Sequence, residues 1–312
     1  MRFIVWSCVL AGACLVFACD SGPEPGPVRK QVVYFSSDRG GGRNMNIWRM
    51  DPDGENLRQV THYAKGDYWP ADVSPDGQRL LFFRLDDYTL ISSIYLMDVG
   101  GPEPSLGDAV LPGLSAAGNF FPDGQRFIYD HYVHTSDSTG NEAALVYDLR
   151  TRQSIQISPP GFVLAFAQVS PDGDQVCFSA FGGPDQYATQ TYLLNLGSGA
   201  MQRLTPAESG RYTERCRFSP AGDKVFFSMR GNIFWADLPG GALHDIPRLG
   251  IETWPSANTS GSRVFFRQGG GYRADSLSEI MSINLDGSGL KRLTNDMYRD
   301  DKPVVDVIEV EE

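Results

Sequence analysis

The chain has 312 residues, of which 41% are hydrophobic and 21% are charged, and its formal net charge is −11. This composition is typical of a soluble globular protein. Because phosphate contacts require clustered Lys and Arg, an acidic chain without a basic stripe argues against a nucleic-acid partner.

The N-terminal segment 1–18 has the form of a secretory signal. One basic residue, Arg2, precedes an apolar run from Phe3 to Ala18 that is short for a membrane span. The run ends in "LVFAC", which resembles the lipobox of bacterial lipoproteins, with Val16 three residues before Cys19 and a small residue directly before it. We therefore predict cleavage after residue 18 and lipidation of Cys19.

Two alternatives to this processing stay open. Cys14 follows "AGA" and is a second candidate for lipidation, and an ordinary signal peptide would be cleaved near Ala18. Residues 19–30 are rich in Pro and Gly, which predicts an extended tether between the lipid and the fold. The expected location is the bacterial cell envelope, facing the periplasm or the surface.

The remaining chain, 31–312, repeats one turn followed by one strand. The turn appears as "SPDG" or a close variant, and its glycines are Gly77, Gly124, Gly173, Gly222 and Gly261. In such a turn Pro sets φ at the first corner, Asp caps the backbone and Gly takes a positive φ. Intervals of 40 to 50 residues are typical of propeller blades.

Each turn is followed by two apolar runs, such as "RLLFF" and then "SIYLMD", and by a shorter final strand. The runs are apolar at nearly every position, as expected for strands that neighbouring blades cover on both faces. No helical period occurs. The pattern predicts an all-β fold with four strands in each blade.

The blade count requires the two ends of the propeller to meet. The first blade begins at Gln31–Ser37 without an inner strand before it, and Pro303–Val307 follows the last blade without partners of its own. Placing Pro303–Val307 as the inner strand of the first blade closes a six-bladed β-propeller without a long exposed edge.

The "SPDG" turns, the segment Tyr34–Thr61 and the segment Gly66–Gly77 resemble the TolB-type six-bladed propellers. The resemblance covers the propeller module and not the N-terminal domain that TolB carries before it. It implies a monomeric, non-catalytic binding scaffold of the cell envelope that binds a protein or peptide. Such a fold does not by itself settle function.

The repeated turns lie at one end of the propeller, the turn end, and longer loops lie at the opposite end, the loop end. The loop segments are rich in Tyr, Trp and Arg, the composition of a contact surface. The candidate partner-binding residues are Tyr68, Trp69, Tyr187, Arg211, Tyr212, Trp254, Tyr272, Arg273, Tyr298 and Arg299. An alternative for Trp69 and Trp254 is that they wedge between blades.

Catalytic signals are sparse. His131 and His134 are three residues apart and form a weak metal candidate. No Gly-x-Ser-x-Gly elbow occurs, so we predict no catalytic residues and no cofactor. The alternatives are a glycan lyase or hydrolase and a sugar or small-ligand sensor that uses the same loop end.

Two cysteines, Cys177 and Cys216, lie in apolar strands of the propeller. They could pair in an oxidising compartment. We predict two buried free thiols, because free Cys behaves as a small apolar residue.

Overall fold

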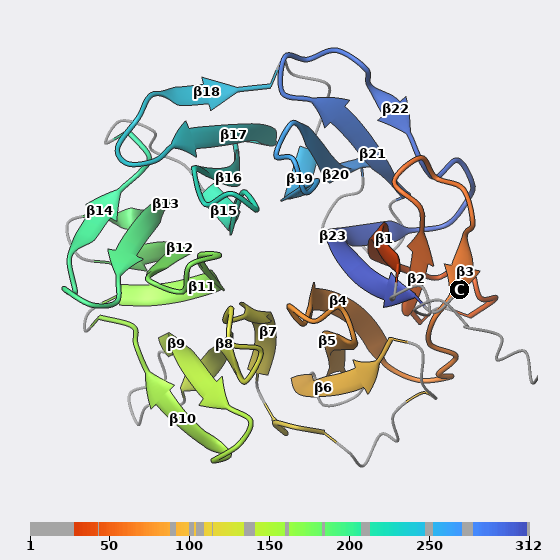
Figure 1. Cartoon of the computed structure of the whole chain (residues 1–312), viewed down its shortest axis with the longest axis horizontal. Helices are drawn as coiled ribbons and strands as arrows, with labels where there is room; N and C mark the ends of the chain where they lie inside the picture. The colour runs from red at the N-terminus through yellow and green to blue at the C-terminus, as the bar shows by residue number, and fades with distance from the viewer. Residues whose placement is uncertain are drawn as a thin grey trace, which may run out of the picture.

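The computed structural model describes residues 28–42, 44–87, 92–99, 103, 109–113, 115–133, 141–159, 162–182, 185–206, 213–246, 252–269 and 277–310. Their regular secondary structure is all β, in strands β1 to β23. The strands form six sheets that are arranged as blades in a ring (Figure 1). The fold is the predicted six-bladed β-propeller.

The first blade combines the two ends of the propeller, as predicted. Its strand order is β23-β1-β2-β3. The bounds are β23 (Asp300–Val310), β1 (Val28–Ser37), β2 (Asn46–Met50) and β3 (Arg58–Gln59). Strand β23 runs antiparallel to β1 over their whole lengths, from Val28↔Val310 to Ser37↔Asp300. Figure 1 shows the two ends side by side, with β1 in red against β23 in blue.

The other five blades follow in chain order. Blade 2 contains β4 (Asp67–Val73), β5 (Arg79–Leu85) and β6 (Ser92–Asp98). Blade 3 contains β7 (Ser115–Phe120), β8 (Arg126–Val133), β9 (Asn141–Asp148) and β10 (Gln153–Gln156). Blade 4 contains β11 (Phe162–Val169), β12 (Gln175–Gly182), β13 (Asp185–Asn195) and β14 (Met201–Arg203). Blade 5 contains β15 (Thr213–Phe218), β16 (Lys224–Met229), β17 (Asn232–Asp237) and β18 (Leu243–Asp245). Blade 6 contains β19 (Glu252–Ala257), β20 (Arg263–Gly269), β21 (Ser278–Asn284) and β22 (Lys291–Arg292).

Two boundaries differ from the sequence prediction. Strand β1 begins at Val28, so Val28–Lys30 belong to the first blade and not to the tether, because they pair with β23. Strand β23 is longer than the predicted Pro303–Val307 for the same reason. In blade 2 the described residues form three strands, and outside them Leu111 makes an isolated bridge to Ile94 on β6.

The apolar strands are buried on both faces because every blade packs against two others. In β1, Val32 and Tyr34 belong to a core cluster shared with blade 2, whereas Val33 and Phe35 belong to a cluster shared with blade 6. Six such clusters occur, one at each junction between neighbouring blades. This packing explains why the strands are apolar at successive positions.

The repeated turns satisfy their own polar groups. In the first turn, Ser74 Oγ hydrogen-bonds to Asp76, and the backbone N–H of Gln78 donates to the same carboxylate at 3.1 Å. Gly77 has φ 75° and donates its N–H to the Ser74 carbonyl at 2.7 Å. These contacts hold the pKa of the Asp76 carboxyl below its usual value against the opposing effect of burial.

No helix among the described residues is long and apolar enough to cross a membrane.

Candidate functional site: the central cavity

The inner strands of four blades contain a β-bulge at which one residue adopts a left-handed backbone. These residues, with φ between 52° and 62°, are Phe166, Arg215, Trp254 and Lys302. A positive φ is unfavourable for residues with a Cβ and is concentrated at functional sites.

Phe166, Arg215 and Trp254 each lie seven residues before the glycine of the repeated turn. Pro70 and Ala117 hold that sequence position in blades 2 and 3, where they pair directly with β5 and β8. Lys302 holds the equivalent place in β23. The pairing of β23 with β1 is interrupted between Asp301 and Val304, and Lys302 lies in this bulge. We call these six positions the bulge layer.

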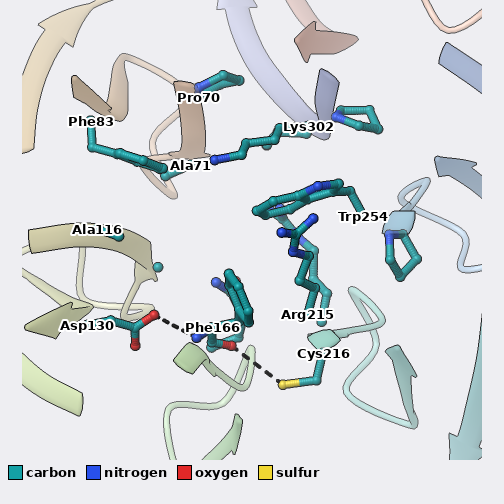
Figure 2. A pocket seen from close by; sticks show the side chains of 16 residues that line it. Pro70, Ala71, Phe83, Ala116, Asp130, Phe166, Arg215, Cys216, Trp254 and Lys302 are labelled. Atoms are coloured by element: carbon teal, nitrogen blue, oxygen red, sulfur yellow. Dashed lines mark hydrogen bonds between the residues drawn. The ribbon is translucent and has the colours of Figure 1, made fainter. Parts of the chain in front are cut away.

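Pro70, Phe166, Arg215, Trp254 and Lys302 of the bulge layer line a cavity of about 190 Å³ on the propeller axis. Figure 2 shows its lining, with Phe83, Ala71 and Ala116 on one side and Arg215 and Trp254 on the other. Small residues line the cavity from blades 2 and 3, namely Pro70, Ala71, Ala116 and Gly118, whereas Phe166, Arg215, Trp254 and Lys302 line it from the other blades. Because the inner strands start at the loop end, the bulge layer lies toward that end of the channel.

An aromatic and cationic cluster forms one side of this cavity. The Arg215 guanidinium carbon lies 3.2 Å from the Trp254 ring centroid and 4.8 Å from that of Phe166. The Lys302 ammonium lies 4.5 Å from the Trp254 ring centroid. In Figure 2 the Trp254 indole lies between the Lys302 and Arg215 side chains. Trp254 thus holds two like charges near each other through cation–π contacts.

The Lys302 ammonium also contacts the other side of the ring. Its Nζ is 3.8 Å from the Trp69 ring centroid and 4.6 Å from that of Phe83. Burial lowers the pKa of Lys302 to about 7 and Arg215 adds to this shift, while Asp301 opposes it. Desolvation favours the neutral amine, so Lys302 titrates near neutral pH.

A second layer lies closer to the turn end and is polar. Arg217 on β15 donates to Asp72 on β4 at 2.9 Å and so links blades 5 and 2 across the channel. Asp72 also accepts the backbone N–H of Phe120 at 2.9 Å, and Asp306 accepts that of Val73 at 3.1 Å. Burial, together with repulsion from Asp306, raises the pKa of the Asp72 carboxyl well above its usual value.

One carboxylate stabilises the strained backbone beside the cavity. Asp130 on β8 accepts the backbone N–H of Phe166 at 2.6 Å and that of Ala167 at 3.2 Å. Blade 3 therefore holds the bulge of blade 4 in place. Because both of its oxygens accept backbone hydrogen bonds, Asp130 is fixed within the wall of the cavity (Figure 2).

The two tryptophans of the predicted contact set have different surroundings. Trp254 lines the cavity, whereas Trp69 packs against the core between blades 2 and 3 and contacts the Lys302 ammonium. The prediction for Tyr68 is wrong, because its side chain is fully buried and stacks on Tyr63 with ring centroids 4.6 Å apart. Tyr68 belongs to the core between blades 1 and 2.

Tyr298 and Arg299 lie at the loop end, in and beside the segment that leads into β23. The Tyr298 side chain is 40% exposed, and the Arg39 guanidinium lies 5.9 Å from its ring centroid. Arg299 is held by its neighbours, with Nε 3.2 Å from Met45 Sδ and its guanidinium 4.0 Å from Asp67. Tyr298 fits the predicted surface better than Arg299 does.

Several predicted residues fall outside the described part of the chain. They are Cys19, His134, Arg211, Tyr212, Tyr272 and Arg273. Tyr187 lies in β13, but its side chain is also outside the description. The predictions for these residues stay untested. His131 lies on β8 with Nδ1 3.1 Å from Ser115 Oγ.

Cys177 on β12 and Cys216 on β15 are free and buried in one core cluster between blades 4 and 5. This confirms the predicted placement of two buried thiols. Burial, with the Cys177 thiol beside it, raises the pKa of the Cys216 thiol well above its usual value. The Cys216 thiol is therefore protonated at neutral pH and unreactive.

Sequence reasoning missed the cationic members of the site. Arg215 and Phe166 could have been found from the sequence, because each lies seven residues before the turn glycine of its repeat, as Trp254 does. Lys302 had no such signal, because no repeated turn follows β23. Only the pairing of β23 with β1 gives its position.

The ring of six blades and the lined axial cavity define a β-propeller with a candidate binding site. The chain belongs to the TolB beta propeller domain family, whose model matches residues 22–305. That match covers most of the chain and agrees with the sequence resemblance.

Known relatives support the same fold. TolB from Acinetobacter baumannii has a TM-score of 0.70 at 20% identity, over 88% of this chain and 66% of that one. A putative TolB from Agrobacterium tumefaciens has a TM-score of 0.61 at 19% identity, over 91% of this chain and 100% of that one. An uncharacterized protein of Agrobacterium fabrum is 34% identical over 121 residues, which are 36% of this chain and 40% of that protein. The chain thus spans less than two thirds of the first of these structures and of the curated relative.

Proposed function

We propose that the protein is a non-catalytic binding scaffold of the bacterial cell envelope. In this proposal Cys19 carries a lipid, residues beyond it act as a tether, and the loop end of the propeller binds a protein or peptide. The family and the fold support a scaffold role, and the N-terminal sequence supports the envelope and the lipid anchor.

The observation that carries the proposal is the side-chain content of the bulge layer. One backbone position of the repeat carries Phe166, Arg215, Trp254 or Lys302 in different blades, and these side chains gather around one cavity. Aromatic residues and Arg, partly desolvated and clustered, are the residues that dominate binding energy at interfaces. Tyr298 adds an exposed aromatic side chain at the same end.

The binding proposal is tested by capture from solubilised membranes with the lipidated protein, followed by measurement of affinity with each captured protein. Trp254→Ala and Tyr298→Ala should each weaken binding by roughly 1–3 kcal/mol, the usual cost of losing an interface anchor. Asp172→Ala at the turn end is the control and should leave the affinity of the folded protein unchanged. If the turn variant loses binding while the loop-end variants keep it, the site is at the opposite end.

The lipid anchor has its own test. Cells that express the wild type or Cys19→Ala are labelled with a radioactive fatty acid. Only the wild type should take up label and remain in the membrane fraction. Equal labelling of both proteins contradicts anchoring at Cys19, and a loss with Cys14→Ala instead would move the anchor to that residue.

A further inference from the structure

More cationic than anionic side chains line the cavity. The lining contains three cationic side chains, Arg215, Arg217 and Lys302, and one carboxylate, Asp130. Arg217 is paired with Asp72, and both oxygens of Asp130 accept backbone hydrogen bonds. Among the described residues, no carboxylate lies within ion-pair distance of the Lys302 ammonium. Its neighbours there are aromatic rings.

The walls of the cavity are otherwise apolar and its volume is small. Pro70, Ala71, Phe83, Phe166 and Val304 contribute apolar surface. The cavity measures about 190 Å³. This volume suits a side chain or a small molecule, and it is too small for a folded chain segment.

We propose that the cavity binds a carboxylate on a short aliphatic body, with the carboxylate at the Lys302 ammonium and the aliphatic body against the apolar walls. Arg215 adds attraction for the anion through its charge. The carboxylate is either the acidic side chain of a peptide or a free short-chain acid. The peptide source rests on the proposed function, whereas the free acid does not.

Binding should be coupled to a proton. The charged groups that act on Lys302 are Asp301 beside it on β23, Arg215 on β15, Asp67 on β4 and Arg267 on β20. Arg267 is 3.4 Å from Asp301, so these two charges largely offset each other. With its pKa lowered to about 7, Lys302 is only partly protonated at neutral pH. A bound carboxylate favours the ammonium form, so its binding takes up a proton.

The test titrates the whole chain with sodium butyrate at constant ionic strength. Binding is followed by the change in total tryptophan fluorescence, to which Trp254 and Trp69 beside Lys302 contribute. Butyramide is the neutral control of the same shape. Butyrate should bind saturably and butyramide should not. The butyrate affinity should fall by roughly tenfold from pH 6 to pH 8, as the protonated fraction of a group of pKa about 7 falls.

Variants assign the site to Lys302. Lys302→Met should lose at least roughly tenfold in butyrate affinity at pH 6, about the 1.4 kcal/mol of one power of ten. Lys65→Met, at an exposed lysine of the loop end, should bind as the wild type does. Lys302→Arg should bind with an affinity that stays constant from pH 6 to pH 8, since the guanidinium does not titrate there. This variant keeps the test valid if Lys302→Met fails to fold.

A second arm separates the two sources of the carboxylate. The pentapeptide acetyl-Gly-Ser-Glu-Ser-Gly-amide is compared with its Gln counterpart. Tighter binding of the Glu peptide than of butyrate supports a peptide ligand, and the reverse supports a free acid. Absence of saturable binding of both acids, or binding that is unchanged in Lys302→Met, overturns the carboxylate site. Capture of a partner equally by the wild type and Lys302→Met would then leave the proposed function standing.

Discussion

The turn end and the bulge layer belong to the same sequence repeat, but side-chain identity recurs only at the turn end. At the turn end both backbone and side chains recur, so Ser170 contacts Asp172 as Ser74 contacts Asp76. At the bulge layer the backbone recurs in four blades while the side chain changes from Phe166 to Arg215 to Trp254. The turn end satisfies its own polar groups, whereas the bulge layer directs aromatic and cationic groups into a cavity.

The difference shows where a repeat protein can change without losing its fold. A turn residue that hydrogen-bonds its own backbone cannot be replaced without loss of stability. A side chain that points to the axis of a propeller meets open space, so its identity is set by a ligand or by the charges around it. The strained backbone at Trp254 and Lys302 is maintained by the neighbouring strands.

The largest effect on stability should come from removing β23, because the turn end and the bulge layer both depend on this strand. Deletion of residues 303–312 removes most of the inner strand of the first blade and exposes the edge of β1. We expect a loss of about 5 kcal/mol or more, comparable with the whole stability of a typical domain. Thermal unfolding of the truncated chain measures this, and an unchanged midpoint would show that the ring closes without β23.

A smaller effect is expected from the ion pair that spans the channel. Arg217→Ala should cost about 3 kcal/mol, because it leaves the partly buried Asp72 without its cation. The matched control is Arg126→Ala, which breaks an exposed pair with Asp123 and should cost less than about 1 kcal/mol. Urea unfolding gives both values. Equal losses of stability would mean that the ion pair across the axis stabilises the protein no more than a surface ion pair does.

The pH dependence of stability isolates Lys302. Its pKa is lowered from 10.5 in the unfolded chain to about 7, so its contribution to stability is present above pH 10.5 and is lost as the pH falls through 7. Lys302→Met should therefore melt at a higher temperature than the wild type at pH 6, by about 3 °C. The difference should shrink as the pH rises toward 10. Lys65→Met should show no such trend, and a constant difference would contradict the lowered pKa.

The repeated turns predict a still smaller and purely structural effect. Asp172→Ala removes the acceptor of Ser170 Oγ and of the Asp174 backbone N–H, and should cost about 1 kcal/mol. Contacts with Ser170 and with backbone N–H groups lower the pKa of Asp172, so this contribution is present above the unfolded value of 3.8 and is lost as the pH falls below it. Chemical unfolding at pH 7 and pH 3 should show a smaller cost at the lower pH.

The least effect is expected from the two cysteines. Cys177 and Cys216 are free and buried, so neither should react with a thiol reagent in the folded protein. After unfolding without reductant, both should titrate. A mass two units below the dithiol form would reveal a bridge between blades 4 and 5 and contradict this placement.

The amino-acid sequence by itself determined the propeller. Turn chemistry is local, so "SPDG" specifies the same reversal wherever it occurs, and apolar runs between such turns need two covered faces. The same reasoning placed the inner strand of the first blade at Pro303–Val307, because an unpaired edge is unfavourable. It also placed Cys177 and Cys216 correctly in buried strands.

Tertiary structure alone decided which side chains share the axis. Tyr68 and Trp69 are adjacent in an apolar strand, yet Tyr68 is packed between blades while Trp69 meets Lys302 from the opposite end of the chain. Local sequence cannot say which face of a strand with two covered faces points to the channel. The cavity, the lowered pKa of Lys302 and the pairing of Arg217 with Asp72 all depend on closure of the ring, which brings together residues from different blades.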